Sequence, residues 1–402
     1  MSTKYCPHCL PTKNKGHFFN RIEYYLRKFF VFEFADVQVN KTLVLKLLKM
    51  FKMFKLISFD ENPDRNKIKN RSYIFIDEAK KRNIKISAVK FLNNYNGEYI
   101  FEFEGKEYRY TGTPLSLFRG RKFDVDDKAR IKRLLAKYGV PVSKGKSFWS
   151  AKEAYEYSRE LSSPVVVKPN RGSLSHHVSV NIQSPEETQK VIKIALEYQP
   201  EIIVEKYVSG ALYRVTIVNY EKIYICEKRL ASIVGDGVSS IKELIEQKNI
   251  NEKRGGPTST LPRIEITEQL IDVLKQNNDP SPDFVLNKDR KIFLANKFTL
   301  ASGCEIINVK EKNHPKNIEM FFKASKILGQ PLIGFDFICP DISKPYDEQD
   351  CAIIEANGFP YLDMHQFPSS GLSEDVAKDV WDVVLSSFRS AKVGAQEIEP
   401  PM

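Results

Sequence analysis

Two apolar segments near the end of the chain constrain its fold most. They are IGFDFICPD at 333–341 and AIIEANGFPYLDMH at 352–365, and each carries acidic side chains within a run of strand-forming residues. Because strand side chains alternate between two faces, Glu355 and Asn357 point to the same side. A carboxylate in an apolar strand needs a partner, which is either a basic side chain at the strand end or a metal ion. Two carboxylate groups and an amide oxygen suit Mg²⁺ beside phosphates, so Asp336, Glu355 and Asn357 are predicted metal ligands.

The sequence from residue 126 onward alternates between helical and strand-like segments. A helix is expected over 127–138, because Gly139 provides a C-cap and Pro141 follows it. The later segments are strands at 164–170 and 201–208, a helix at 185–198, alternating strands at 211–219 and 222–234, and an amphipathic helix at 314–329. Strands and helices interleave with many antiparallel pairs and no repeat of fixed period, which predicts an α+β fold.

The first part of the chain, rich in lysine and aromatic residues, is assigned to a small α/β N-terminal lobe. Its run LVLKLLKMFKMFKLI at 43–57 is apolar except for regularly spaced lysines. We interpret it as a buried helix whose lysines reach outward, with a basic helix lying on a membrane as the alternative. Residues 84–110 alternate like a hairpin and predict a small sheet.

These patterns divide the chain near residue 120. The expected parts are an N-terminal lobe at 1–118, a larger domain at 119–390 and a tail at 391–402. Within the larger domain we expect one subdomain at about 119–205 and a second at about 206–390. The second contains a polar segment at 242–283 that is rich in Gly, Pro and Asn, and we expect it to form an excursion over the candidate site.

Composition narrows the classes of partner. The chain has 402 residues and a net charge of +11, so it attracts anions such as nucleotide phosphates, acidic substrates, nucleic acid or anionic lipid. The lysines are spread along the chain and no nucleic-acid-binding motif is present, so no nucleic-acid partner is expected. No secretory signal and no run of 18 apolar residues is found, which predicts a cytoplasmic protein without stable membrane insertion.

The six cysteines do not indicate a disulfide framework. Four of them are single residues within apolar, strand-like stretches, a pattern typical of reduced core thiols. Cys6 and Cys9 have the spacing of metal ligands, but only His17 lies nearby and a structural zinc requires four ligands. A mobile, reduced N-terminal tail is therefore favoured over a zinc site.

Charged side chains lie at several points where an apolar segment would open onto a cleft. Lys128 begins a helix, Lys168 ends the run PVVVK, and Glu205 ends the run IIVE. Lysines neutralise phosphates, and a short extended segment after Glu205 offers backbone groups to an adenine edge. A loop of small residues at 169–177 is suited to close over phosphates through its N–H groups and serines. The predicted nucleotide-binding residues are Lys128, Lys168, Ser173, Ser175, Glu205, Lys206, Tyr207 and Val208.

Six ordered segments resemble a known family. They cover about residues 120–385 and resemble ATP-grasp ligases, most closely the ATP-grasp module of cyanophycin synthetase: DDKARIKRLLAKYGVPVSKG, VVVKPNRGS, IIVEKYVSGALYRVTIVN, EKRLASIVGDGVSSIKELI, GFDFICPDISKP and IIEANGFPYLDMHQFPSSG. The resemblance implies the ATP-grasp fold, in which two α+β subdomains hold the nucleotide. It also implies ATP and Mg²⁺ as cofactors and transfer of the γ-phosphate to a carboxylate. The resulting acyl phosphate is attacked by an amine, and ADP and phosphate leave.

The same resemblance implies roles for individual residues. Lys128 and Lys168 match the lysines that contact ATP phosphates, and the residues from Glu205 to Val208 match the adenine-binding hinge. Arg214 and Arg229 match basic residues near the transferred phosphate and the acyl group, where fixed cations stabilise developing negative charge. The residues expected to act in catalysis are Arg214, Arg229 and Lys168, and the expected metal ligands are Asp336, Glu355 and Asn357.

The sequence departs from the family pattern at three places. Gly210, Ala211 and Leu212 occupy the region where relatives carry an acidic ribose-binding residue, so the ribose must be held differently. The phosphate loop has Ser175, His176 and His177 where relatives have glycines. The C-terminal ligase module of cyanophycin synthetase has no counterpart in this sequence, so polymerisation of alternating residues is not expected.

The segment after the last strand is expected to border the substrate. His365 matches a histidine common in the cyanophycin-like subgroup, with a structural role as the alternative. Ser369, Ser370 and Gly371 offer groups that would hold a carboxylate, with an N-cap of the following helix as the alternative. Together with Arg229, these are the predicted substrate-binding residues.

The expected function is ATP-dependent joining of a carboxylate to an amine, forming an amide or peptide bond on an amino acid or small peptide. The expected partners are these small molecules, with a homo-oligomer possible. Two alternatives stay open. One is a kinase-like enzyme that stops at the phosphorylated product, and the other is a regulatory protein with a degenerate nucleotide site.

Overall fold

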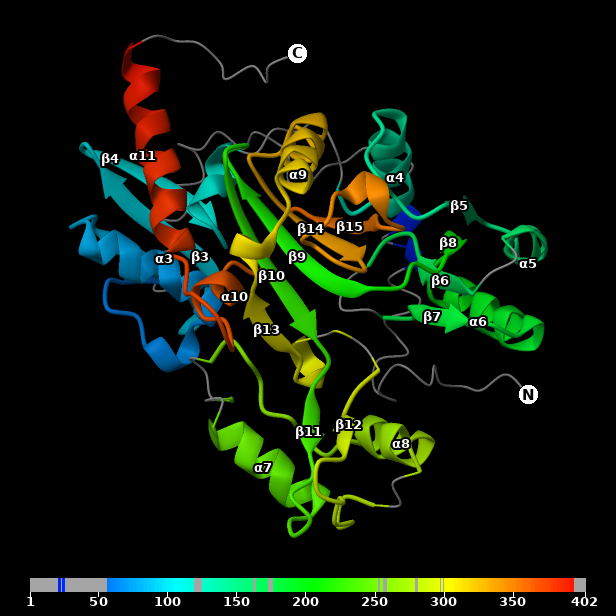
Figure 1. Ribbon diagram of the computed structural model, residues 1–402. Helices are drawn as coiled ribbons and strands as arrows, with labels where there is room; N and C mark the ends of the chain where they lie inside the picture. The colour runs from blue at the N-terminus through cyan, green and yellow to red at the C-terminus, as the bar shows by residue number, and fades with distance from the viewer. Residues whose placement is uncertain are drawn as a thin grey trace.

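The computed structural model describes residues 21–22, 24–25, 56–118, 125–161, 164–172, 176–251, 254–255, 259–278, 281–296, 298 and 300–393. Within these residues the chain forms sheets of four, five and four strands and a two-stranded ribbon, and every pair of named strands is antiparallel. Helices lie against these sheets, as Figure 1 shows. The predicted α+β class is confirmed.

A five-stranded sheet forms the centre of the molecule (Figure 1). Its strands, in spatial order, are β13 (Glu305–Asn308), β10 (Lys222–Arg229), β9 (Ala211–Val218), β14 (Leu332–Cys339) and β15 (Ala352–Asn357). Helices α4 (Lys128–Lys137) and α9 (Pro315–Leu328) pack against one face, where Leu135, Phe321 and Phe335 are fully buried. The burial of each such side chain contributes about 1.5–3 kcal/mol to the free energy of folding. This apolar packing leaves the opposite face of the sheet for polar side chains.

The two helices of this layer confirm the sequence predictions. Asp127 Oδ1 accepts a hydrogen bond from the Arg130 N–H at 3.0 Å and caps α4, and Gly139 follows the helix at φ +72°. Helix α9 begins at Pro315 and ends before Gly329, which has φ +60°. Proline at the first position and glycine after the last turn are typical helix boundaries.

A four-stranded sheet lies beside the central one. Its strands, in spatial order, are β5 (Gly145–Phe148), β8 (Ile202–Lys206), β6 (Val165–Pro169) and β7 (Ser179–Ile182), and helices α5 (Ala151–Glu160) and α6 (Pro185–Tyr198) pack on it. The strands predicted at 164–170 and 201–208 and the helix predicted at 185–198 are confirmed. Lys168 Nζ of β6 donates to the Ile354 carbonyl of β15 at 3.2 Å, so the two sheets meet along this line.

The N-terminal lobe contains a third sheet, with strands β1 (Ile57–Asp60), β2 (Ile86–Phe91), β3 (Asn94–Phe103) and β4 (Lys106–Thr111) in sequence order, and helix α3 (Asn70–Lys81). This confirms the sheet predicted from residues 84–110. Of the helix predicted over 43–57, residues 43–55 lie outside the described residues, and Ile57 begins β1.

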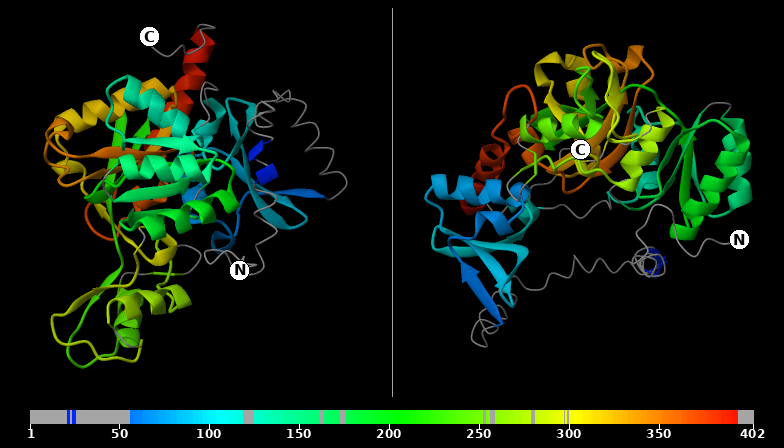
Figure 2. Two further views of the ribbon diagram at one scale, coloured as in Figure 1. Left: turned by 90° about the vertical axis from the view of Figure 1, so that its right-hand side faces the viewer. Right: turned by 90° about the horizontal axis from the view of Figure 1, so that it is seen from below.

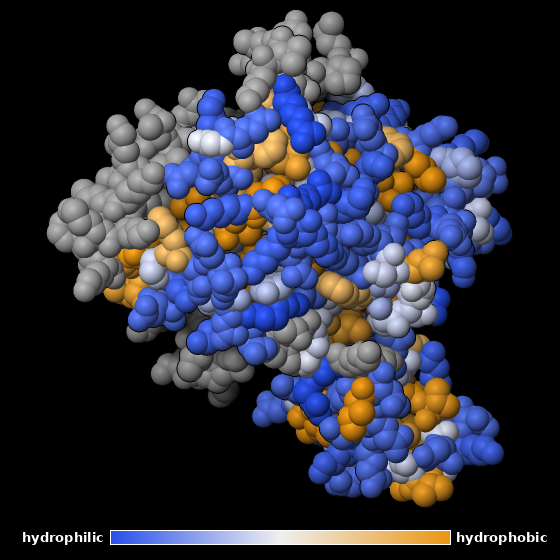
Figure 3. Space-filling model, turned by 90° about the vertical axis from the view of Figure 1, so that its left-hand side faces the viewer, coloured by the Kyte–Doolittle hydropathy of each residue, from blue (hydrophilic) through white to orange (hydrophobic). Residues whose placement is uncertain are grey.

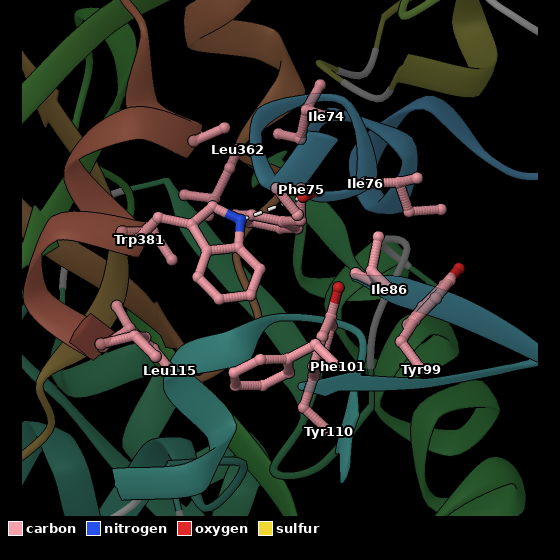
Figure 4. Close-up of a cluster of buried hydrophobic side chains, with 14 of the residues drawn as sticks. Ile74, Phe75, Ile76, Ile86, Tyr99, Phe101, Tyr110, Leu115, Leu362 and Trp381 are labelled. Carbon is pink, nitrogen blue, oxygen red and sulfur yellow. Dashed lines mark hydrogen bonds between the residues drawn. The ribbon is translucent and has the colours of Figure 1, made fainter. Parts of the chain in front are cut away.

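The last helix of the chain packs against this lobe. Helix α11 (Val376–Val393) places Trp381 in the core of the lobe, where its Nε1 donates to the Phe75 carbonyl at 3.0 Å and its ring meets the Phe101 ring edge-on at 4.9 Å (Figure 4). The buried cluster also includes Leu362, which precedes α10 (Asp363–Gln366). The lobe is therefore joined to the segment that follows β15.

A smaller lobe projects from the second half of the chain (Figures 1 and 2). It consists of β11 (Ser232–Val234), α7 (Ile241–Asn251), α8 (Glu268–Gln276) and β12 (Lys291–Phe293), with a core of its own that includes Ile233, Leu274 and Leu286. We call it the excursion lobe, and the segment predicted at 242–283 lies within it. Figure 3 shows it as a protrusion from the main body.

Short 3₁₀ helices complete the described structure: Arg65–Lys67, Pro114–Phe118, Leu300–Ser302, Lys310–Lys312 and Tyr346–Glu348. The predicted reduced thiols are confirmed for Cys226, Cys304, Cys339 and Cys351, which are buried and free. Cys6, Cys9 and His17 lie outside the described residues. Among the helices that are described, none has the length and apolar character needed to span a membrane.

Candidate active site

One face of the central sheet carries a row of polar side chains. Arg214 on β9 lies opposite Asp336 on β14, and Asp336 lies opposite Glu355 on β15. Two residues further along, Thr216, Gly334 and Asn357 form a parallel row on the same three strands. We call this surface the site face, because it brings together the three predicted metal ligands and one predicted catalytic arginine.

Asp336 is the most strongly held member of the site face. It is 7% exposed, and its carboxylate accepts from Arg214 Nε at 2.8 Å, from Arg214 Nη2 at 3.2 Å and from Lys228 Nζ at 3.3 Å. Burial alone would raise its pKa, but the two cations lower the pKa of Asp336 to about 2. The same carboxylate raises the pKa of the buried Arg214 against the effect of burial. Both side chains are therefore charged at neutral pH.

Gly334 makes room for this pair. A Cβ at that position would lie 2.7 Å from the Pro360 Cβ and 3.2 Å from Arg214 Nη1. Both positions are closer than ordinary van der Waals contact, so a larger residue would push Arg214 away from Asp336. The sequence IGFD thus places the smallest residue beside the arginine that the acidic residue needs.

A second buried carboxylate lies where the four-stranded sheet meets the central one. Glu205 of β8 is 2% exposed, and Lys168 Nζ donates to its Oε1 at 2.7 Å while Lys132 Nζ donates to its Oε2. Burial raises the pKa of Glu205, but the two lysines more than offset this and lower it to about 2. Burial lowers the pKa of Lys132 to about 8, aided by the charges of Lys168 and Lys128 and opposed by Glu205.

Lys128 lies at the start of α4 and reaches toward both sheets. Its Nζ donates to the Gly172 carbonyl at 2.7 Å and lies 3.3 Å from the Glu355 carboxylate. The two lysines predicted to contact phosphates therefore both approach β15, Lys168 at the Ile354 carbonyl and Lys128 at the next side chain. They form a cationic edge beside the predicted metal ligands.

Two cations of this site were not predicted from the sequence. Lys132 follows Lys128 by one helical turn on α4, on the buried side of the helix, and this spacing is the signal that could have identified it. Lys228 shares a face of β10 with Cys226, whereas the neighbouring Arg229 alternates to the other face. The strand alternation could have favoured Lys228 as the residue next to Asp336.

The predicted adenine hinge follows Glu205 directly. The N–H of Lys206 donates to the Lys144 carbonyl and that of Tyr207 to the Pro164 carbonyl, each at 2.8 Å. For the N–H of Val208, the structure shows no such bond within the described residues. Lys206 Nζ contacts Asp350 at 2.9 Å. The contact of this hinge with an adenine stays a prediction.

The start of the predicted phosphate loop is fixed by Asn170. Its Oδ1 accepts from the Ala129 N–H at 2.9 Å, and its Nδ2 donates to Asp127 at 3.1 Å and to Glu201 at 3.0 Å. These bonds tie the loop to the first turn of α4, where Lys128 begins. Sequence reasoning did not single out Asn170.

Further along the loop, two predicted contacts lie outside the described residues, namely Ser173 and Ser175. Gly172 has φ +128°, a conformation that favours glycine. The His177 ring stacks on Tyr198 of α6 with centroids 4.3 Å apart, so this imidazole packs against the helix that covers the sheet.

The donor set fits the Mg²⁺ ion that the family implies. Glu355 and Asn357 project from one face of β15, with Asp336 beside them, and the buried Asn357 Nδ2 has no hydrogen-bond partner. Since the O and N of an amide are assigned from their surroundings, this orphan position also suits an Asn357 oxygen turned toward a cation. Within the described part of the chain, no group of three or more His, Cys, Asp or Glu side chains is arranged so that it could hold a metal ion.

His365 lies inside the protein. It is 1% exposed, and its Nε2 is 2.8 Å from the Thr216 Oγ1 on the site face. Burial, together with the charges of Arg214, Lys310 and Lys228, lowers the pKa of His365 to about 3. The imidazole is therefore neutral at physiological pH, and its contact with Thr216 joins α10 to β9.

Ser369 and Ser370 pair with the edge strand β13. Ser369 Oγ accepts from the Ile306 N–H at 2.8 Å, its own N–H donates to the Ile306 carbonyl at 2.7 Å, and the Ser370 carbonyl accepts from the Asn308 N–H at 2.9 Å. Gly371 follows at φ +89°. The alternative of an N-cap is wrong for these serines, because α11 begins later, at Val376, and Asp375 accepts from the Lys378 N–H.

Arg229 lies at the exposed end of β10. Its side chain is 53% exposed, and its guanidinium pairs with Glu227 at 2.6 and 2.8 Å. Among the described residues, no contact joins it to Asp336 or Glu355. Its predicted role in catalysis and substrate binding stays a prediction.

Comparisons with known proteins agree with this arrangement. The D-ala D-ala ligase C-terminus family matches residues 134–251. Cyanophycin synthetase of Synechocystis sp. is 32% identical over 271 residues, which cover 66% of this chain and 31% of that protein. The bifunctional glutathione biosynthesis protein of Clostridium perfringens is 25% identical and covers 78% of this chain and 40% of its own length. The chain thus spans less than half of these relatives.

A solved structure shows the same fold. The bifunctional glutathione synthetase from Pasteurella multocida superposes with a TM-score of 0.59 at 22% identity, over 79% of this chain and 44% of that one. The chain therefore has the fold of the ATP-grasp ligases and is similar to them in sequence.

Proposed function

We propose that this protein uses ATP and Mg²⁺ to join a carboxylate to an amine, forming an amide or peptide bond with release of ADP and phosphate. The observation that carries the proposal is the convergence of Lys128 and Lys168 on β15, beside Glu355 and the Arg214–Asp336 pair. Cations from helix α4 and from strand β6 and oxygen ligands from the central sheet lie along a common line, as a nucleotide with its metal requires.

The chemistry assigned to this chain is mainly electrostatic. Lys128 and Lys168 neutralise phosphate oxygens, and Lys132 holds Glu205 in place beside them. Arg214, fixed by two hydrogen bonds to Asp336, keeps a positive charge where negative charge develops on the transferred group. Asp336, Glu355 and Asn357 would hold Mg²⁺, which supplies further positive charge to the phosphates when bound.

The substrates follow from the relatives only in class. The family that matches is described as a D-ala D-ala ligase, and the relatives include proteins of glutathione biosynthesis. An amino acid or small peptide is accordingly the proposed substrate. We assign nucleotide and metal binding to the domain at 119–390 and part of the substrate site to the lobe at 1–118. The four reduced, buried cysteines favour the cytoplasm.

The test combines the protein with ATP, Mg²⁺ and pooled amino acids or dipeptides. The expected result is ADP formation together with a new mass equal to the condensed product. Lys168→Ala and Glu355→Gln should abolish ADP formation while leaving the circular dichroism spectrum unchanged. Lys152→Ala, at an exposed position on α5, and Glu319→Gln, at an exposed position on α9, serve as matched controls.

The same assay separates the alternatives. A kinase-like enzyme would accumulate a phosphorylated product without an amine, whereas a ligase releases phosphate only when an amine is supplied. A degenerate regulator would bind no ATP with Mg²⁺ or would form no ADP with any mixture. Turnover retained in both Lys168→Ala and Glu355→Gln would refute the proposed site.

A further inference from the structure

Another buried carboxylate lies beyond the site face. Asp363 begins α10, six positions after Asn357, and is only 5% exposed. Its Oδ2 accepts one long hydrogen bond, from Thr260 Oγ1 at 3.3 Å, and its Oδ1 has no partner. No ion pair within 4.0 Å reaches it from any of the described residues. Buried polar atoms in native proteins are nearly always paired, so this orphan oxygen calls for an explanation.

Asp363 lies where three parts of the chain meet. Asn70 of α3 in the N-terminal lobe donates to Thr260 Oγ1 at 2.9 Å, and Thr260, from the chain between α7 and α8, donates to Asp363. Helix α10 also contacts α3 and lies next to it in Figure 1. The carboxylate of Asp363 is therefore enclosed by α3 of the N-terminal lobe, by the chain between α7 and α8, and by α10 itself.

Two arginines of the N-terminal lobe flank the carboxylate without pairing with it. Arg65 donates to the Ile68 carbonyl and to Asn70, and Arg71 lies over the Tyr361 ring at 4.8 Å. Both are near enough for their charges to favour the ionised form of Asp363. Within the described residues neither forms an ion pair with a carboxylate. A buried acid with one free oxygen, beside arginines that form no ion pair with a described carboxylate, can bind a ligand that carries both charges.

We propose that Asp363 and Arg71 bind a free α-amino acid, Asp363 through its α-ammonium group and Arg71 through its α-carboxylate. An ammonium donates up to three hydrogen bonds and would satisfy Oδ1, while a planar guanidinium matches a carboxylate. This inference rests on the proposed function, since it assigns one of the two substrates. It adds residues that the sequence did not indicate and gives the N-terminal lobe a direct part in recognition.

The alternative of a purely structural cluster predicts different chemistry. A structural cluster would be complete, as it is around the buried Glu78 of α3, whose carboxylate pairs with Arg82 Nε at 2.7 Å. Asp363 instead keeps its charge among groups that leave one oxygen free. Its burial raises the pKa to about 6, a destabilising state that a bound ammonium would relieve.

The experiment is calorimetric titration of the full chain, in the presence of ADP and Mg²⁺, with each proteinogenic L-amino acid in turn and then with the 2-hydroxy acid analogue of the one that binds best. We expect the analogue, which lacks the ammonium, to bind wild type about tenfold to hundredfold more weakly. In Asp363→Asn the amino acid should bind as weakly as the analogue. The carboxamide analogue, which lacks the negative charge of the α-carboxylate, should also bind wild type more weakly than the amino acid does. In Arg71→Gln this difference in affinity should be lost.

Asp272→Asn, at an exposed position on α8, is the matched control and should bind like wild type. Undiminished discrimination in Asp363→Asn, or no binding of any amino acid to wild type, overturns the site. ADP formation is measured separately in the same samples with ATP. If ADP still forms and Asp363→Asn prefers the amino acid over its 2-hydroxy acid analogue as strongly as wild type does, the ligase function stands and this site is refuted. If the amino acid binds in a way that depends on Asp363 but no ADP forms, the site stands and the ligase function is refuted.

Discussion

The carboxylates of Asp336 and Asp363 are almost equally buried but differ in their charge environment. Asp336, on the site face, has an arginine and a lysine as partners, and its pKa falls to about 2. Asp363, at the junction with the N-terminal lobe, has one hydroxyl, and its pKa rises to about 6. Burial by itself opposes ionisation, and only hydrogen-bonded cations reverse the direction. The charge of Asp336 is neutralised by cations of the protein itself, whereas Asp363 has no such hydrogen-bonded cation among the described residues.

Glu205 shows a further distinction among the satisfied carboxylates. It is held by Lys132 and Lys168, whereas Asp336 receives two hydrogen bonds from a single guanidinium. Lysine is a compact charge on a flexible stem, so Lys168 can turn from Glu205 toward a phosphate. Arg214 is held in one orientation. The Glu205 cluster therefore suits the release of Lys168 toward a phosphate, whereas the Asp336 cluster keeps Arg214 fixed.

The largest effect is expected from Arg214→Met. The substitution leaves Asp336 buried with Lys228 as its remaining cation, and loss of a buried partner typically costs about 3–5 kcal/mol. Urea unfolding at neutral pH measures the change in the free energy of unfolding. If Asp336 were instead well solvated, the loss would stay below about 1 kcal/mol, as for surface pairs.

Lys132→Met should cost less, about 2–3 kcal/mol, because it removes one charge-assisted hydrogen bond from Glu205 and leaves Lys168 in place. The remaining lysine would then be bound to Glu205 more tightly, and we expect a higher KM for ATP. The measurements are urea unfolding and ADP formation as a function of ATP. An unchanged KM would show that Lys132 serves stability alone.

Asp363→Asn should stabilise the protein by about 3 kcal/mol at pH 7 in the absence of ligand, because each pKa unit corresponds to about 1.4 kcal/mol. The pKa of Asp363 is about 6 in the folded state and about 3.9 in the unfolded state. Between about pH 4 and pH 6 the folded state therefore holds a proton on Asp363 that the unfolded state has lost. The wild type is therefore penalised fully above about pH 6, and the penalty disappears as the pH falls toward about 4.

Unfolding free energies of wild type and Asp363→Asn, measured from pH 4 to pH 8, give the check on this linkage. The gap between the two proteins should open between about pH 4 and pH 6 and then stay constant. Asp272→Asn should show no such gap. A constant difference at every pH would mean that Asp363 has an ordinary pKa in the folded protein.

The smallest stability effect is expected from Arg229→Met, below about 1 kcal/mol, because an exposed pair such as Arg229–Glu227 contributes little. The informative measurement for this variant is its rate of ADP formation. If Arg229 contacts substrate as the family resemblance implies, ADP formation falls while the urea midpoint stays the same. Unaltered turnover would remove Arg229 from the site and leave Arg214 and Lys228 as the cations near Asp336.

Local patterns in the sequence determined most of the elements. The period of apolar residues, with the C-cap at Gly139, indicated α4 and α9, and the alternation in β15 placed Glu355 and Asn357 on one face. These features depend on residues a few positions apart, so they can be read without knowing the fold. The ordered motifs then indicated the superfamily.

Tertiary structure decided which charges meet. Lys132 reaches Glu205 and Lys228 reaches Asp336 across large distances in sequence, and the packing of Trp381 joins helix α11 to α3 of the N-terminal lobe. The same packing buried His365 and left Asp363 without a cation. No periodicity encodes these contacts, because each depends on which elements pack side by side. The sequence by itself determined the strands and their faces, and only the fold decided which buried carboxylates are neutralised.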